Sequence, residues 1–285
     1  MRTGTIRHVS DTALWVAMYR AFESERPDAL FHDPYARKMA GERGEAIVKS
    51  MPRARSMGWP MVVRTQVMDE IVLRSCGSGL RTVLNLAAGL DARAFRLDLP
   101  ESLLWIDVDL PDMIAYRREH LGDAKPRCRH EHVASDLANP ESLDEVLDRA
   151  RDWEPPVLVV TEGLLVYLTS DQVAALATRL HREPRIASWL TDLASPLLLD
   201  MLKRSWQPSL SAAGAPLQFA PAEGTAFFAP LGWREAEFRS MWDESLRLRR
   251  TVPLAPLWRL VSRLRSKETR ERYRRMSGIV LLERR

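Results

Sequence analysis

Acidic residues follow several short apolar runs in the middle of this chain, at the points where strands would end. Asp109 and Glu162 each follow such a run directly, and Asp136 comes two residues after the weaker run 130–134. An ionised carboxylate only accepts hydrogen bonds, so it suits the two hydroxyl donors of a ribose, the exocyclic amine of an adenine, or a cation. These residue types therefore indicate a site for a ligand that has a nucleoside part.

A turn of small residues precedes the first of these acids. The segment VLNLAAGLDARAFRL reads as strand, turn and helix, with Ala87, Ala88 and Gly89 in the turn. Three residues with almost no side chain let a ligand approach the backbone closely. Many α/β proteins have such a turn, so this motif alone leaves cofactor binding and a plain connection equally open.

Asp109 lies 20 residues after Gly89, at the tip of the apolar run 103–108. An acid at this place in a doubly wound sheet binds a ribose, and we expect Asp109 to do so with Asp107 beside it. The alternative is that Asp109 caps a helix starting near Pro111. Asp136, before Leu137, could contact adenine or could simply stabilise a turn.

Glu162 comes directly after the apolar run 157–161. A carboxylate that emerges from a buried strand needs a partner, because a buried charge is costly when it is unpaired. The partner could be an arginine of the chain. It could also be a cationic ligand such as S-adenosylmethionine (SAM), which carries an ammonium and a sulfonium.

The elements around these residues alternate between strands and helices. Strands are expected at 81–86, 103–108, 130–134, 157–161 and 186–193, with a closing strand at 277–283. Helices are expected at 111–120, 140–152 and 170–182. This alternation predicts an α/β fold with a parallel, doubly wound sheet.

The remaining segments suggest one domain, 1–285, in four parts. Residues 1–76 have helical periodicity and form an N-terminal cap, and residues 77–194 form the cofactor-binding core. Prolines and glycines are frequent in 195–235, which indicates a lid insertion, and 236–285 completes the core. Aromatic residues of the lid either line a substrate pocket or form the core of the lid itself: Trp206, Phe219, Phe227, Phe228 and Trp233.

Composition excludes several classes of protein. The net charge of +4, from 42 basic and 38 acidic residues, does not require a nucleic-acid partner. Basic residues do gather between 247 and 285, as a solvated helix face or as a surface that attracts anions. Cys76 and Cys128 form no metal-ligand or redox motif, the histidines are scattered, and no metal is expected. A disulfide framework is not expected from two cysteines, which fits a reducing cytoplasm. No run reaches the ~20 apolar residues of a membrane span.

The strings NLAAGLDARAFRL, DVDLP, SDL and TEGLLVYL together resemble the leucine carboxyl methyltransferase-like family, in particular its bacterial polyketide O-methyltransferase branch. The resemblance extends to SDTALWVAMYRAFESERPDALFHDPYA near the N-terminus and to PAEGTAFFAPLGWREAEFRSMWDE near the C-terminus, so it covers nearly the whole chain. It implies a class I SAM-dependent methyltransferase with a Rossmann-like, seven-stranded sheet.

The resemblance also implies roles for matching residues. Arg64 would bind the methionine carboxylate, Ala87 to Gly89 would approach the methionine and ribose, and Asp107 and Asp109 would hold the ribose. The remaining implied contacts are Asp136 and Leu137 with adenine, Glu162 with the methionine and sulfonium, Tyr167 with the transfer region, and Arg20 with the cofactor or the substrate acid. The family has glycine where this chain has Ala87, and alanine does not readily adopt positive φ, so weaker SAM binding is expected.

The activity implied is methyl transfer from SAM to a carboxylate or hydroxyl of a small molecule, with a flat polyketide-like acid as one candidate. Glu162 and Tyr167 are the expected catalytic residues. A catalytically inactive SAM-binding or partner-binding module remains open, as does a nicotinamide-dependent oxidoreductase, because AAGLDA is a degenerate form of a dinucleotide-binding turn. The chain carries no signal for its oligomeric state.

Overall fold

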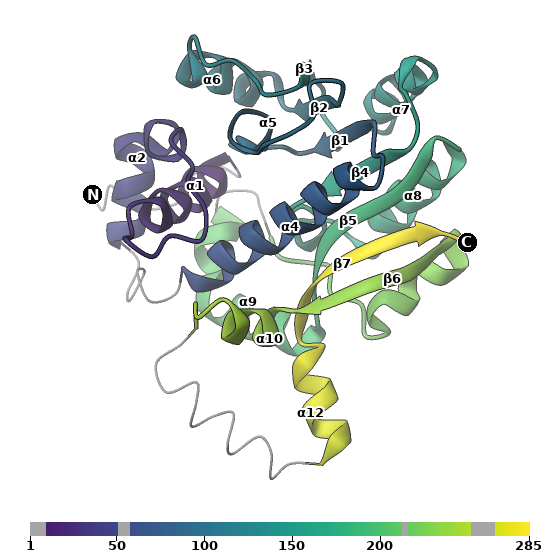
Figure 1. The fold of residues 1–285 in the computed structure, drawn as a ribbon. Coiled ribbons are helices and arrows are strands. Elements are labelled where there is room, and N and C mark those ends of the chain that lie inside the picture. Colours follow the sequence, from purple (N-terminus) through teal and green to yellow (C-terminus); the bar gives the residue numbers. More distant parts are fainter. Residues whose placement is uncertain (1–9, 51–57, 213–215, 252–265) are drawn as a thin grey trace.

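The computed structural model describes residues 10–50, 58–212, 216–251 and 266–285 (Figure 1). Its centre is a seven-stranded sheet with the strand order β3-β2-β1-β4-β5-β7-β6. The strands are β1 (Thr82–Leu86), β2 (Leu104–Asp109), β3 (Arg129–Ala134), β4 (Val157–Thr161), β5 (Ile186–Ala194), β6 (Trp233–Ser240) and β7 (Ser277–Arg284). The strand order switches between β1 and β4: β2 and β3 extend the sheet on one side of β1, and β4 and β5 extend it on the other. Ligands bind at such a switch point in doubly wound folds.

The sheet is mixed rather than wholly parallel. Strands β1 to β5 pair in parallel, whereas β7 is antiparallel to both β5 and β6. Ser277 lies opposite Ala194, so the chain enters β7 at the carboxyl end of β5 and must run back. The edge strand β6 was not predicted from the sequence, because its residues WREAEFRS are mostly polar. It begins at Trp233, inside the segment expected to form the lid.

Both faces of the sheet are covered by helices. Val83 and Leu158 pack against helices α1, α4 and α5 on one face, while Leu84 and Val159 pack with α7 and α8 on the other. Neighbouring residues of one strand point to opposite faces, so strands that are buried on both faces need continuous apolar runs. The run 157–161 meets that requirement, and every one of its residues is buried.

The described residues before β1 are mainly helical and lie over one side of the sheet in Figure 1. Their helices are α1 (Ser10–Ser24), α2 (Ala36–Ser50) and α4 (Trp59–Gly77). The crossover elements are α5 (Arg93–Arg96), α6 (Pro111–Leu121), α7 (Pro140–Asp148), η1 (Arg149–Asp152), η2 (Leu165–Tyr167) and α8 (Ser170–Arg182). A capping box between Thr169 and Gln172 stabilises the first turn of α8 and so fixes where this helix begins.

The later part of the chain adds α9 (Pro196–Ala212), η3 (Gly224–Leu231), α10 (Met241–Arg247) and α12 (Lys267–Arg274). Helices α10 and α12 contact each other and lie below the sheet in the view of Figure 1. Among the residues described, no helix is both long and apolar enough to cross a bilayer.

Candidate cofactor site and active site

The turn after β1 has an unusual backbone. Ala87 has φ 53° and Gly89 has φ 52°, so both are left-handed. Ala87 thus adopts the conformation that alanine does not readily take, and hydrogen bonds hold the turn from both sides. Ala88 N–H donates to the carbonyl of Val108 at 3.1 Å, and Gly89 N–H donates to Asp109 Oδ2 at 2.6 Å. A left-handed alanine costs about 1–2 kcal/mol, which the rest of the turn must offset.

Asp109 lies at the tip of β2 and faces this turn. Its second oxygen, Oδ1, accepts from the N–H of Leu110 at 2.7 Å. The N-terminal residue of α6 is capped by no side chain, so the alternative role of Asp109 as a helix cap is not observed. Partial burial raises the pKa of the Asp109 carboxyl, although two N–H donors oppose this. The carboxylate keeps lone pairs for further donors.

Asp107 points into the protein instead. Its side chain is 1% exposed, and Oδ2 lies 2.6 Å from Arg117 Nη2 and 2.8 Å from His130 Nε2. Oδ1 accepts from Asn85 at 2.8 Å and from Trp105 at 2.9 Å. These partners hold the pKa of Asp107 far below its ordinary value despite burial. With both oxygens taken by protein donors, Asp107 has none to offer a ribose, and β2 presents only Asp109 to the turn.

The segment after β3 is more exposed. Asp136 is exposed, and its Oδ1 accepts from Ala138 N–H at 3.0 Å, which is the turn-stabilising role considered as the alternative. Leu137, beside it, is half-buried and packs against the core on the α8 face. One Asp136 oxygen therefore stabilises the turn, and the other has no hydrogen bond within the described residues.

Glu162, directly after β4, is paired with two arginines. Oε1 accepts from Arg64 Nε at 2.9 Å, and Oε2 accepts from Arg93 Nη1 at 2.7 Å. The two guanidinium groups lower the pKa of Glu162 to about 2 in spite of its burial. The sequence left an arginine partner and a cationic ligand open, and in this structure the partners are arginines.

Arg64 comes from α4 and reaches the ends of two strands. Besides Glu162, it contacts Asp192 Oδ2 near the end of β5 at 3.3 Å through Nη1. Asp192 also accepts the N–H of Gly163 at 2.6 Å. Gly163 has φ 66°, and a Cβ there would lie 3.1 Å from Arg64 Nη1. Nη2 of Arg64 forms no hydrogen bond with any residue that the structure describes.

A chain of buried ion pairs continues from Glu162 behind the turn. Arg93 also contacts Asp91 at 2.7 Å and Asp69 at 2.6 Å, and it is 2% exposed. Asp69 in turn contacts Arg96 at 2.7 Å. Sequence reasoning missed Arg93, Asp69 and Asp192, because a charge becomes a site residue only when distant elements bring a partner to it. The one local signal was the pair of arginines in DARAFR, whose cationic side chains follow a buried strand.

Arg20 and Tyr167 bring the N-terminal cap and η2 to the site. Arg20 is 7% exposed, donates to Asp33 at 2.9 Å, and also donates to the carbonyl of Leu90 in the turn. The Tyr167 hydroxyl pairs with Thr12 of α1 and lies near Arg64 and Asp192, and burial raises its pKa. Helix α1 also touches the turn itself, since a Cβ on Gly89 would lie 3.3 Å from that of Ala13.

Three aromatic residues of the expected lid are core residues rather than pocket walls. Phe219, Phe228 and Trp233 are each 1% exposed or less. Phe228 and Trp233 both pack edge-on against Trp189 of β5, at centroid distances of 5.4 and 5.8 Å. The interpretation as a stacking surface is therefore wrong for these three, because the sheet needs apolar cover on this face. The Trp206 side chain lies outside the described residues.

Within the described ranges, one group of side chains has the composition of a metal site: Asp107, His130 and His132. Arg117 lies 2.6 Å from the Asp107 oxygen that His130 also contacts. Burial and this cation lower the pKa of His132 to about 4. The Arg117 guanidinium would repel a divalent cation bound to the same Asp107 oxygen. We therefore assign the three residues to a buried polar cluster around Asp107, called the buried hub below.

A small-residue turn, an acid at the tip of β2 and an acid–arginine cluster after β4, all at the carboxyl edge of this sheet, define the class: the protein has the class I SAM-dependent methyltransferase fold. Solved structures with this fold match nearly the whole chain at low identity. A DUF574 family protein from Streptomyces avermitilis has 14% identity and a TM-score of 0.60, covering 94% of this chain and 97% of its own. A candidate methyltransferase from Thermobifida fusca has 14% identity and a TM-score of 0.56, covering 94% of each chain.

The chain belongs to the leucine carboxyl methyltransferase family, whose model matches residues 13–181. Among its relatives is a protein of Parafrankia sp. (strain EAN1pec), named as a candidate SAM-dependent methyltransferase, which is 34% identical over 86% of this chain and 83% of its own length. Another, with the same kind of name, is from Streptomyces avermitilis and is 30% identical over 86% of this chain and 89% of its own. The family expected from the sequence motifs is thus confirmed.

Proposed function

We propose that this protein is a SAM-dependent methyltransferase that methylates an oxygen of a small molecule, and that its acceptor is a carboxylate. The observation that carries the proposal is the arrangement at the carboxyl edge, where Asp109, Arg64 and Glu162 surround a turn without bulky side chains. Relatives that align with 86% of the chain are named as SAM-dependent methyltransferases, which supports the methyl donor.

The residues present fit SAM. Asp109, which has acceptors and no donors at neutral pH, would hold the two ribose hydroxyls, while Asp136 and Leu137 would contact the adenine. Arg64 would bind the methionine carboxylate through Nη2, and Glu162 would accept the ammonium. Ala87, Ala88 and Gly89 would let the cofactor approach the backbone. Because Asp107 is fully engaged inside the protein, we assign it to positioning Asn85 and Arg117 and not to the ribose.

SAM, when bound, supplies a methyl group that is already activated by the positive sulfonium. The protein's own contribution is to align the acceptor and to exclude water. Tyr167 has a raised pKa and therefore stays protonated at neutral pH, so its hydroxyl can donate a hydrogen bond that orients the acceptor. Arg64, held by Glu162 and Asp192, keeps the methionine end in a fixed position.

The same titration properties favour a carboxylate over a hydroxyl acceptor. A phenol has a pKa near 10 and benefits from a general base, whereas a carboxylic acid is already ionised at neutral pH. Glu162, with a pKa of about 2, is a poor base, and Tyr167 holds its proton tightly. Neither of the two expected catalytic residues, Glu162 and Tyr167, is therefore suited to take a proton from a phenol.

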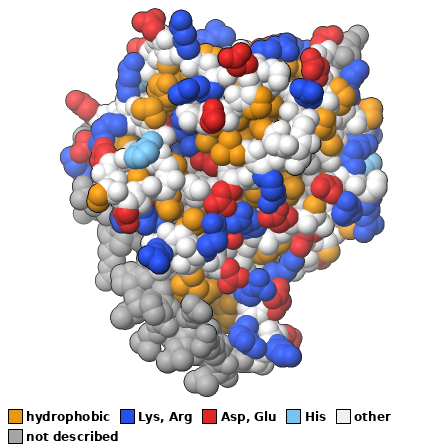
Figure 2. All heavy atoms as spheres, viewed as in Figure 1, with side chains coloured by type: hydrophobic (Ala, Val, Ile, Leu, Met, Phe, Trp, Pro, Cys, Tyr) orange, Lys and Arg blue, Asp and Glu red, His pale blue; other side chains and the backbone are white. Residues whose placement is uncertain are grey.

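A small molecule fits the surface better than a nucleic acid. Acidic and basic side chains are interspersed over the face seen in Figure 2. Affinity for nucleic acid rests on a continuous basic footprint that neutralises several phosphates. The viewed face presents no such footprint.

Calorimetric titration with SAM and S-adenosylhomocysteine tests the cofactor site. Asp109→Asn keeps the shape but removes the charge, so we expect it to weaken SAM binding by about 10- to 100-fold. Asp112→Asn is the matched control, because Asp112 is an exposed acid three residues away in the first turn of α6. Equal SAM affinity of wild type and Asp109→Asn, or no binding by the wild type, would contradict the proposal.

The acceptor class is tested by turnover of matched aromatic carboxylates and phenols at several pH values. A carboxylate acceptor predicts a rate that is nearly constant between about pH 6 and 9, because the acceptor is ionised throughout. Turnover of phenols alone, with a rate that rises with pH, would overturn the carboxylate assignment but leave the cofactor site intact.

A further inference from the structure

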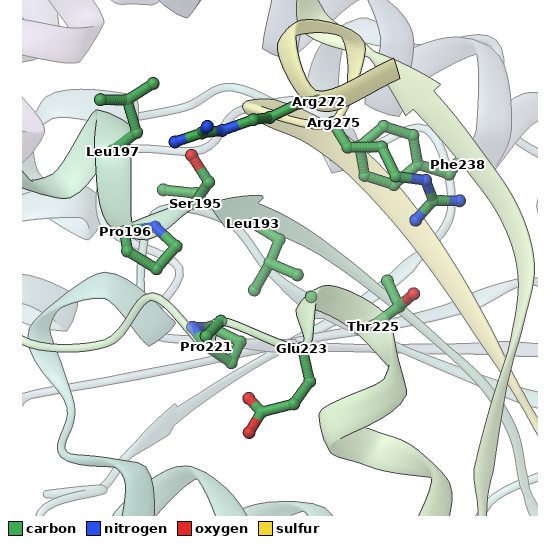
Figure 3. Close-up of a pocket in the computed structure, with 13 residues that line it drawn as sticks. Leu193, Ser195, Pro196, Leu197, Pro221, Glu223, Thr225, Phe238, Arg272 and Arg275 are labelled. Carbon is green, nitrogen blue, oxygen red and sulfur yellow. The ribbon is translucent and has the colours of Figure 1, made fainter. Parts of the chain in front are cut away.

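A pocket lies apart from the cofactor turn, at the outer part of the same sheet edge (Figure 3). It has a volume of about 350 Å³. Its walls come from the end of β5, the first turn of α9, the start of η3, Phe238 of β6, and α12. Leu193, which lines it, directly follows Asp192, the residue that holds Arg64. The pocket therefore shares a strand with the cofactor site without sharing its residues.

The walls of this pocket are largely apolar. Leu193 and Pro221 are buried, and Leu197 and Phe238 stand on opposite sides in Figure 3. Leu197 is 38% exposed. Met201, one turn further along α9, is 51% exposed. Apolar area thus continues from the pocket onto its rim, as in sites that bind organic molecules.

Two arginines of α12 line the pocket, and they differ in their partners. Arg275 contacts Glu235 at 2.6 Å and Glu271 at 3.5 Å, and its guanidinium lies 4.4 Å above the Phe238 ring. Arg272 forms no ion pair with any residue in the described ranges. Its side chain extends across the pocket toward Leu197 in Figure 3.

The start of α9 adds positive potential on the same side. Pro196 is the first helical residue and follows Ser195, whose hydroxyl accepts from Leu198 N–H at 3.4 Å. The N-terminal end of a helix of 17 residues carries a partial positive charge that favours an anion. Glu223 also lines the pocket, but its carboxylate points away from Arg272 in Figure 3. The charge of Arg272 and the helix end therefore act together.

We propose that this pocket binds a small organic anion with an apolar body, such as an aromatic or short aliphatic carboxylate. The apolar walls would cover the body of the ligand, and Arg272 with the start of α9 would bind its carboxylate. Inorganic phosphate fits less well, because it has no apolar body to cover the apolar walls. The site lies beyond the cofactor site, so its occupation does not depend on methyl transfer.

The test uses 2-naphthoate and its neutral amide, 2-naphthamide, with binding to the full chain followed by fluorescence. We expect saturable binding of 2-naphthoate that Arg272→Gln weakens by about 3- to 10-fold, with a much smaller effect on 2-naphthamide. Arg270→Gln is the matched control, because Arg270 is an exposed arginine of the same helix that does not line the pocket. Equal effects of the two variants would overturn the role of Arg272.

A second pair of variants tests the pocket itself. Ala222 lines it and Ala226 of η3 does not, and both are exposed. Ala222→Trp should abolish naphthoate binding by filling the cavity, whereas Ala226→Trp should leave it unchanged. Naphthoate binding that survives Ala222→Trp would place the ligand elsewhere and overturn the proposal. A parallel titration with SAM separates this result from failure of the cofactor site, because the two ligands contact different residues.

Discussion

At the turn after β1, Ala87 and Gly89 bend the backbone so that the N–H of Gly89 meets Asp109 at 2.6 Å. Ala87 has φ 53°, so its methyl group is strained there. Glu162 shows a different kind of local conflict, since an acid at the end of a buried strand is tolerated only because two arginines reach it. The positive φ of Ala87 and the buried charge of Glu162 are both locally unfavourable. Each helps to place polar groups at the proposed cofactor site.

Replacing Ala87 by glycine should relieve the strain. We expect Ala87→Gly to raise the free energy of unfolding. Relief of the strained φ contributes about 1 kcal/mol, and the greater conformational entropy of glycine in the unfolded chain reduces this gain. Urea unfolding measures the change. The control is Ala88→Gly, whose φ is not positive, and which should lose about 0.5–1 kcal/mol. If Ala87→Gly destabilises as much as Ala88→Gly, the turn is not strained.

Glu162 should make stability depend on acid pH. Its pKa is about 2 in the folded protein and 4.5 ordinarily, so the fold favours the ionised form. That contribution is complete above about pH 4.5 and is lost as the pH falls toward 2. Urea unfolding at a series of pH values should therefore show the gap between wild type and Glu162→Gln narrowing as the pH falls through this range. A constant gap would contradict the prediction.

At the scale of elements, β2 and α6 are joined by the buried hub around Asp107. Arg117 of α6 donates to Asp107 at 2.6 Å and, through the same nitrogen, to the carbonyl of Asp91 at 2.8 Å. Asn85 of β1 bridges Asp107 and the Asp91 side chain. The hub therefore connects a helix and two strands to the turn that carries Gly89.

Removing Arg117 should leave the Asp107 carboxylate in the interior without its guanidinium partner. We expect Arg117→Met to destabilise the protein by about 3–5 kcal/mol, as measured by chemical unfolding. The neighbouring exposed residue supplies a control, and Arg118→Met should change stability by no more than about 0.5 kcal/mol. Combining Arg117→Met with Asp107→Asn should recover part of the loss, because the buried charge is gone. Additive losses in the double variant would show that the two residues are not coupled.

At the scale of the whole molecule, the candidate site joins layers that are far apart in the sequence. Arg64 and Glu162 are separated by 98 residues and meet at 2.9 Å. Arg20 of the N-terminal cap donates to the turn after β1, and Thr12 pairs with Tyr167. SAM bound at the proposed site would contact the cap, the turn and the strand ends together, so its binding should stabilise the domain as one unit.

A ligand that binds only the folded state raises the melting temperature by mass action. At a concentration about 100 times its Kd, S-adenosylhomocysteine should add about 2.7 kcal/mol, which corresponds to a rise of roughly 4–5 °C for a domain of this size. Differential scanning calorimetry measures this shift, which Asp109→Asn should greatly reduce. An unchanged melting temperature at saturating ligand would argue against a site that spans these layers.

Periodicity and residue type alone determined most of the framework. Continuous apolar runs identified β1, β2 and β4, because strands buried on both faces need apolar residues throughout. The pattern of SDQVAALATRLHR defined α8 (Ser170–Arg182) with its bounds. The family motifs predicted acids at the strand ends, and Asp109 and Glu162 lie at the ends of β2 and β4. The strand β6 was not predicted, because an edge strand with mostly polar residues contains no continuous apolar run.

The tertiary structure alone decided how the charges are used. Asp107 and Asp109 are two residues apart and so lie on the same side of β2, yet one is enclosed by Arg117 and His130 while the other reaches Gly89. Arg93 and Asp192 gained their roles from partners that lie far away in the chain. The sequence shows which residues carry charge, but their pairing depends on which strand ends and helices meet in space. Burial then sets the pKa and the partner of each group.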